Sequence, residues 1–169
     1  TDATLAFADF ENSHFNNSIL RRTNFRGVDL TDATLFNTDC REAKFHLGSF
    51  EDVDLTESDL SQATLPSGQS FSDGILRDVQ FSQQKLLDQD LSGATLPGAD
   101  LSGMDLSESN LSNSDLQNAN LTETKLHNSN LDAANLEGAL MNRTSLFGAS
   151  LCNTKLFGAA FSEAQIDIN

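Results

Sequence analysis

The chain has 169 residues, which suits a single domain, and its 25 acidic against 10 basic residues give a formal net charge of −15. Such a surface repels nucleic acid and attracts basic grooves, so we expect a protein partner and no direct nucleic-acid binding. No apolar run approaches the roughly 18 residues that span a bilayer, and no basic-then-apolar leader opens the chain, so we expect no membrane association and a cytoplasmic location.

Large apolar residues recur at every fifth position along the chain. One series runs from Leu5 to Leu65, and after one extra residue a second series runs from Phe71 through Phe161 to Ile166. This period matches neither the 3.6-residue repeat of a helix nor the two-residue repeat of a strand. The chain is therefore predicted to be a repeat protein.

The other positions of each five-residue unit follow the same pattern around this central residue. A small side chain stands two positions before it, an outward residue (mostly Asp, Asn, Thr or Lys) directly before it, and two polar or glycine corner residues after it. The small and central residues can share the inner face of an extended segment. Gly93, Gly98 and Gly103 fall at the second corner position, where a permissive φ favours a turn. Four such sides make a coil of about 20 residues, and coils stack about 4.8 Å apart.

The sequence resembles the pentapeptide-repeat family. The resemblance is carried by units such as Ala99-Asp100-Leu101-Ser102-Gly103, Ala119-Asn120-Leu121-Thr122-Glu123 and Ala134-Asn135-Leu136-Glu137-Gly138, and it extends over essentially the whole chain. It implies an all-β fold, a right-handed quadrilateral parallel β-helix with about eight coils of four pentapeptides. We expect one solenoid over residues 1–169.

The register slips once, at residues 66–70, and the repeats stay irregular to about residue 90. Gln69, Gly74, Gln84 and Gln89 occupy the small position there, where a buried amide without partners costs roughly 1–3 kcal/mol. A bulge that keeps the winding is one interpretation, because the five-residue spacing continues through this segment. A loop or short helix from Pro66 to Asp90 that contacts a partner is the other.

The repeat separates the residues that could form a catalytic, metal or disulfide site. Cys40 is predicted to point inward and Cys152 outward, more than five coils apart, which excludes a disulfide. His46 and His127 are about four coils apart, too far to share a metal or a proton. We therefore expect no enzymatic activity, no cofactor and no metal.

One side of the coil, centred on Phe10, Leu30, Phe50, Phe71, Leu91, Leu111, Leu131 and Leu151, gathers acids without any Lys or Arg, and we call it the acidic side. Its acids are Asp9, Glu11, Asp29, Asp32, Glu51, Asp52, Asp73, Asp90 and Asp132. One interpretation is an interaction surface; the other is that charge keeps a stacked, edge-bearing protein from aggregating. Arg21 and Arg41 stack one coil apart on another side.

The preceding side, centred on Leu5, Phe25, Phe45, Leu65, Leu86, Leu106, Leu126 and Leu146, carries both charges and is called the mixed side. Its corner residues include Phe7, Leu47, Leu87 and Phe147, which with the intervening lysines form a candidate docking strip. Scattered exposed apolar residues are the alternative interpretation.

The resemblance also implies functions. Quinolone-resistance members of the family are described as mimicking DNA in shape and charge and binding DNA gyrase. We therefore expect a DNA mimic that binds or modulates gyrase or another topoisomerase, with a structural spacer or docking module of a larger protein as the alternative. A homodimer that hides an open end of the solenoid is a further expectation, because exposed ends need covering.

Overall fold

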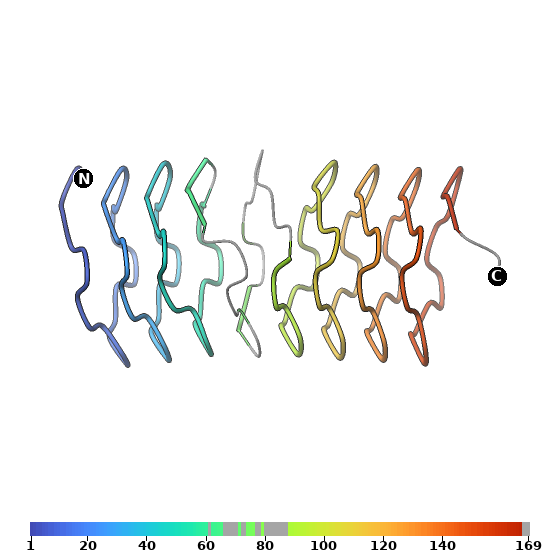
Figure 1. Cartoon of the computed structure of the whole chain (residues 1–169), viewed down its shortest axis with the longest axis horizontal. Helices are drawn as coiled ribbons and strands as arrows, with labels where there is room; N and C mark the ends of the chain where they lie inside the picture. The colour runs from blue at the N-terminus through green and yellow to red at the C-terminus, as the bar shows by residue number, and fades with distance from the viewer. Residues whose placement is uncertain (61, 66–70, 72–73, 77–78, 80–87, 167–169) are drawn as a thin grey trace.

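The computed structural model describes residues 1–60, 62–65, 71, 74–76, 79 and 88–166. Their backbone winds into a straight stack of coils, with the two ends of the chain at opposite ends of the rod (Figure 1). The described residues contain no helix, and their strands are reduced to single-residue bridges at the outward position of each side. Each bridge is parallel and joins one coil to the next, as in Thr4–Asn24 and Asn24–Lys44.

The winding has a period of 20 residues on both sides of the slip. Lys44 pairs with Thr64, and Ile75 pairs with Thr95, each 20 positions apart. Between them the pair Asp54–Ile75 spans 21 positions, and the ring of Phe71 packs on Phe50 with centroids 4.9 Å apart. The same columns of residues therefore continue along each side of the rod. The bulge predicted at 66–70 lies outside the described residues, as do Gln69 and Gln84.

Almost every described corner is a tight turn closed by a backbone hydrogen bond; at Thr38 the N–H donates instead to the hydroxyl of Ser58 at 3.1 Å. In these turns the N–H of the small residue donates to the carbonyl of the central residue three positions before it, as from Ala8 to Leu5 at 3.3 Å. The second corner residue adopts a positive φ, as predicted for Gly93, Gly98 and Gly103. The same conformation is also imposed on bulky residues, including Phe7 at 58° and Leu47 at 64°. For an L-residue other than glycine this region costs about 1–2 kcal/mol.

The core is a single column of central residues. Before the slip it is rich in phenylalanine, and Phe25 stacks on Phe45 with centroids 5.0 Å apart. After residue 88 the central residues are almost all leucine, each buried away from solvent until the last coil. Small hydroxyl residues beside them satisfy their polar groups on the backbone, as where Thr124 donates to the carbonyl of Leu101 at 2.8 Å. Gln89 does point inward, with 2% of its surface exposed.

Candidate functional site

Many of the acids stabilise the turns between sides, and these can be told apart from the acids that make no such contact. At the outward position an Asp or Asn side-chain oxygen accepts the N–H of the first corner residue, as Asp54 does from Thr56 at 2.9 Å. After the slip an Asn one coil further also donates to this oxygen, as from Asn135 to Asp115 at 3.2 Å. The preference for Asp or Asn before each central residue is therefore explained by turn formation and coil stacking.

The acidic side of the first three coils carries carboxylates that no described cation neutralises. Its outward residues Asp9 and Asp29 form a parallel β-bridge through their backbones, so they lie side by side on adjacent coils. Asp29 accepts hydrogen bonds from the hydroxyl and N–H of Thr31, which lower the pKa of its carboxyl group. None of the acids there forms an ion pair with a described residue. We call them the acid cluster: Asp9, Glu11, Asp29, Asp32, Glu51 and Asp52.

The corner members of the acid cluster are not required by the turn. Asp32 and Asp52 stand at the positive-φ position, with φ values of 57° and 52°. Asn tolerates that region as well as Asp, and Asn12 occupies the same column with a φ of 57°. An uncharged residue would therefore form the same corner, so the turn does not explain the charge at Asp32 and Asp52.

The charge density of the cluster approaches that of a nucleic acid. Each of its three coils contributes two carboxylates, and coils in a parallel ladder rise about 4.8 Å, giving roughly one charge per 2.4 Å of axis. Duplex DNA carries one charge per roughly 1.7 Å and each single strand one per roughly 3.4 Å. The charge spacing of the acid cluster therefore lies between that of duplex DNA and that of a single strand.

The remaining predicted acids of this side do not join the cluster. Asp90 accepts hydrogen bonds from Ser92 and Asn110, so it supports the turn and the stacking. Asp132 accepts from the hydroxyl of Ser150 at 2.5 Å and from the N–H of Cys152 at 2.8 Å, and these bonds lower the pKa of its carboxyl group. Asp73 lies outside the described residues. Within the described part of this side, the acids are thus densest in the coils before residue 60, where three successive coils carry two carboxylates each.

The two stacked arginines on the side centred on Leu20 and Cys40 are held by acids of the same side. Arg21 Nε lies 2.6 Å from Asp39 Oδ2, and Arg41 binds both oxygens of that carboxylate at 2.8 Å. Arg41 Nε also lies 3.4 Å from Asp59. These ion pairs were not predicted from the sequence, although Arg21 and Asp39, like Arg41 and Asp59, are 18 positions apart and therefore lie on adjacent coils. A small hollow of about 200 Å³ lies beside this ion-pair ladder.

The cysteines lie where the repeat predicts. Cys40 is buried and Cys152 is exposed, and both are free thiols. Burial, together with the nearby charges of Asp39 and Asp59, raises the pKa of Cys40 to about 12, so its thiol is unreactive. Among the described residues, no three His, Cys, Asp or Glu side chains are grouped so that they could hold a metal ion.

The candidate docking strip divides into separate parts. Phe7 and Leu47 occupy one column of corner residues, with Gly27 between them, and are 71% and 57% exposed. The ring of Phe7 lies so close over Gly27 that a Cβ added there would meet it at 2.7 Å. Phe147 is five coils beyond Leu47, roughly 24 Å at strand spacing, and its ring lies 5.8 Å from that of His127. Leu87 lies outside the described residues.

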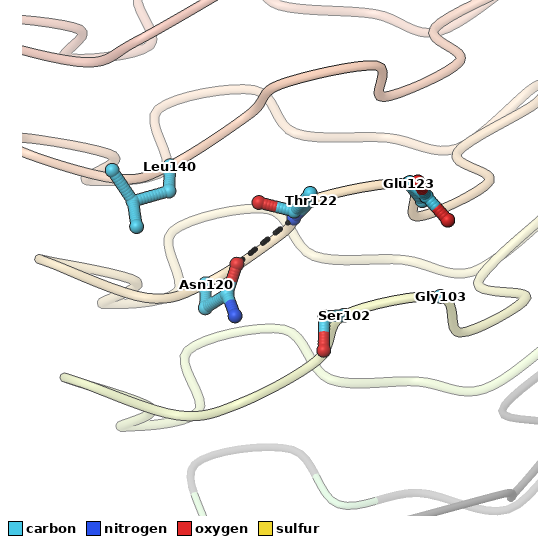
Figure 2. A pocket seen from close by; sticks show the side chains of 6 residues that line it. All are labelled: Ser102, Gly103, Asn120, Thr122, Glu123 and Leu140. Atoms are coloured by element: carbon cyan, nitrogen blue, oxygen red, sulfur yellow. Dashed lines mark hydrogen bonds between the residues drawn. The ribbon is translucent and has the colours of Figure 1, made fainter.

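A second hollow, of about 440 Å³, lies on the side centred on Leu101 and Leu121. Figure 2 shows its lining, which comes from three successive coils. The lining residues are Ser102, Gly103, Asn120, Thr122, Glu123 and Leu140. Asn120 accepts the N–H of Thr122 at 3.1 Å and Glu123 pairs with Arg143 at 2.6 Å, so these polar groups stabilise the turns and the stacking of coils.

The described residues include no helix that is long and apolar enough to cross a membrane.

Comparisons with known proteins agree with this geometry. A family model described as pentapeptide repeats matches in eight copies, over residues 1–37, 75–113 and 105–143. No curated protein matches the sequence. Among solved structures, HetL from the cyanobacterium Nostoc sp. strain PCC 7120, a protein involved in heterocyst differentiation regulation, is 25% identical with a TM-score of 0.52, over 97% of this chain and 83% of HetL.

A second similar structure is that of a trypsin-treated variant of QnrB1, a plasmid-mediated fluoroquinolone resistance protein. It is 17% identical with a TM-score of 0.60, over 98% of this chain and 90% of QnrB1. At that identity the likeness concerns the fold alone. Since the family model covers more than half of the residues and these structures share the winding, the chain belongs to the pentapeptide repeat family and is a right-handed quadrilateral β-helix.

Proposed function

We propose that the protein is a non-catalytic binding protein of the cytoplasm whose acid cluster occupies the basic, DNA-binding groove of DNA gyrase or a related topoisomerase. The acid cluster is the observation that carries this proposal: on three successive coils its carboxylates lack a cationic partner among the described residues and approach the charge spacing of DNA. A basic groove would gain the attraction that DNA normally supplies, and association would be fast and salt-sensitive.

The negative charge of the acid cluster is the reason to favour a topoisomerase partner over the other roles found in the family. HetL and QnrB1 share the winding but are linked to differentiation and to drug resistance, so the fold alone does not select a partner. If the acids only prevented aggregation, they would be useful on any side. Instead, Asp32, Glu51 and Asp52 lie together on one side, and their carboxylates accept no hydrogen bond and form no ion pair among the described residues.

Supercoiling by purified gyrase tests the proposal. The protein is expected to inhibit the reaction at micromolar concentration in low salt, and the inhibition should weaken as salt is added. The triple variant Asp32→Asn, Glu51→Gln, Asp52→Asn should weaken inhibition about tenfold, because each exposed charge contact is worth roughly 0.2–1 kcal/mol. Asp29 is left unchanged because Thr31 uses its carboxylate.

A matched control variant distinguishes a specific cluster from net charge. Glu57→Gln, Asp88→Asn and Glu108→Gln remove the same charge from residues of other columns that take part in no ion pair within the described chain. This control should inhibit like the parent protein. Equal weakening in both variants would reduce the effect to general electrostatics, and a parent protein that leaves supercoiling unchanged would refute the proposal.

A further inference from the structure

The column of Phe7, Gly27 and Leu47, here called the apolar ridge, combines exposure with an unfavourable backbone. Both large side chains are more than half exposed and both stand at a positive φ, where Gly, Asn and Asp are the usual residues. Neighbouring corners of the first coil use Asn12 and Asn17 for the same task. Neither burial nor turn formation therefore explains why this column carries Phe and Leu.

Cations border the ridge on the mixed side. Arg26 directly precedes Gly27, and Lys44 is the outward residue of the five-residue unit that ends in Leu47. Neither has a carboxylate partner among the described residues, whereas Arg21, Arg22 and Arg41 all have one. The chain has a net charge of −15, so two cations without a partner beside an apolar column make the surface charge locally positive where most of the surface is negative.

The other border of the ridge is acidic. Asp9 and Asp29 are the outward residues that follow the corners of Phe7 and Gly27. The ridge thus separates a cationic border from an anionic one. A ligand that is uniformly basic or uniformly acidic would be attracted on one border and repelled on the other.

We propose that the apolar ridge docks an amphipathic helix of a partner protein, whose apolar stripe is edged by acidic residues toward Arg26 and Lys44 and by basic residues toward Asp9 and Asp29. Phe7 and Leu47 are two coils apart, roughly 10 Å, which equals about two helical turns. A stripe with apolar residues four and seven positions apart therefore reaches both.

A second copy of the chain fits the ridge less well than a helix. The acidic side could neutralise Arg26 and Lys44, yet none of the large apolar side chains exposed in the described residues lies on it. A second copy that docked through its acidic side would leave Phe7 and Leu47 facing polar groups. The docking site shares Asp9 and Asp29 with the acid cluster, but its test uses no gyrase, so the two proposals can fail separately.

A synthetic helix is the probe. We would use a fluorescein-labelled peptide of about 18 residues, long enough to form a helix, with a leucine stripe, Glu along one edge and Lys along the other. A second peptide carries Lys along both edges. Binding to the whole protein would be measured by fluorescence anisotropy at about 0.15 M salt, where exposed long-range attraction is largely screened.

The variant Phe7→Asn with Leu47→Asn removes the apolar ridge while placing a residue suited to the positive φ at both corners, so it should fold normally by circular dichroism. It should bind the Glu/Lys peptide at least about tenfold more weakly than the parent does, because two apolar contacts are lost. Arg26→Gln with Lys44→Gln should weaken binding about threefold. Phe147→Asn, the matched control at another exposed aromatic, should leave it unchanged.

The peptide with Lys on both edges provides the opposing result, since it should bind through the acid cluster and ignore the loss of Phe7 and Leu47. The proposal is overturned if the parent protein fails to bind the Glu/Lys peptide, or if the double Asn variant binds it as tightly as the parent. Sedimentation that shows a dimer of the parent and a monomer of the double Asn variant would assign the ridge to a second copy instead.

Discussion

The coils before residue 60 and those after residue 88 share one backbone but differ in their side chains. The earlier coils pack phenylalanine in the core, hold bulky residues at strained corners and carry the acid cluster, which has no ion pair within the described chain. The later coils pack leucine, use more glycine at the corners and link outward residues by Asp–Asn hydrogen bonds. Both proposed binding surfaces lie on the earlier coils.

This difference shows how a repeat protein can vary its surface without changing its fold. Each coil is stabilised mainly by its neighbours, so one region can carry unfavourable groups while regular coils extend elsewhere. Thr23 is an example in the earlier coils, because its hydroxyl is buried and lacks a hydrogen-bond partner among the described residues. Thr124, in the equivalent position of the later coils, has one.

The core substitution with the largest expected effect is Phe45→Ala. Phe45 is fully buried, stacks on Phe25 and contacts the edge of Phe50, so its loss should destabilise the protein by about 4–5 kcal/mol. Leu126→Ala, at the equivalent position of the later coils, should cost about 3 kcal/mol. Urea unfolding followed by circular dichroism measures both.

Hydrogen exchange locates these two losses. In the Phe45→Ala variant, amide protection should fall mainly in residues 1–60, and in the Leu126→Ala variant mainly in residues 88–166, since coils depend on their neighbours. An equal loss of protection along the whole rod in both variants would show that the two regions unfold as one unit. The coils before residue 60 and those after residue 88 would then not differ in local stability.

Corner glycines of the later coils provide the next test. Gly138 has a φ of 69°, and an added Cβ would collide with Asn118 Oδ1 from the preceding coil. Gly103 has a φ of 67° with nothing within 4 Å of that position. Gly103→Ala should therefore cost about 1 kcal/mol for the backbone alone. Gly138→Ala should cost about 0.5 kcal/mol more, because the Asn118 side chain must rotate away from the added Cβ.

Thermal unfolding of the two alanine variants gives the difference, and Asn118→Ala combined with Gly138→Ala assigns it. Removing the Asn118 side chain should recover most of the excess cost of Gly138→Ala. If the double variant is as unstable as the sum of the single variants, the two corners do not contact each other in the way described.

The sequence was sufficient to predict the winding, the central column and the positions of Cys40 and Cys152. Their placement depends only on the five-residue period, and the structure confirms it. The positive φ of Phe7 and Leu47 could not be predicted from propensity, because tertiary stacking overrides the local preference for Gly or Asn. Ion pairs such as Arg21–Asp39 depend on rotamers across coils, which a periodic pattern does not specify.

The equivalent threonines give the smallest and most direct comparison of the two regions, because one substitution should change stability in opposite directions. Thr23 and Thr124 both stand at the small position of the mixed side, and both are fully buried. Thr23→Val removes a hydroxyl without a described partner and should stabilise the protein by about 1 kcal/mol. Thr124→Val removes the bond to the carbonyl of Leu101 and should destabilise it by about 1 kcal/mol.

Urea midpoints of the two valine variants, measured in parallel, check the signs. Valine has nearly the volume of threonine, so packing changes should be small and alike at both positions, and the difference between the variants reports the hydroxyl. Serine at each position is the control, because it keeps the hydroxyl and removes only the methyl group. Destabilisation by Thr23→Val equal to that of Thr124→Val would mean that the earlier coils satisfy their buried groups as fully as the later ones do. The unfavourable features that distinguish the earlier coils would then lie on their surface, in the charges of the acid cluster and the strained corners of Phe7 and Leu47.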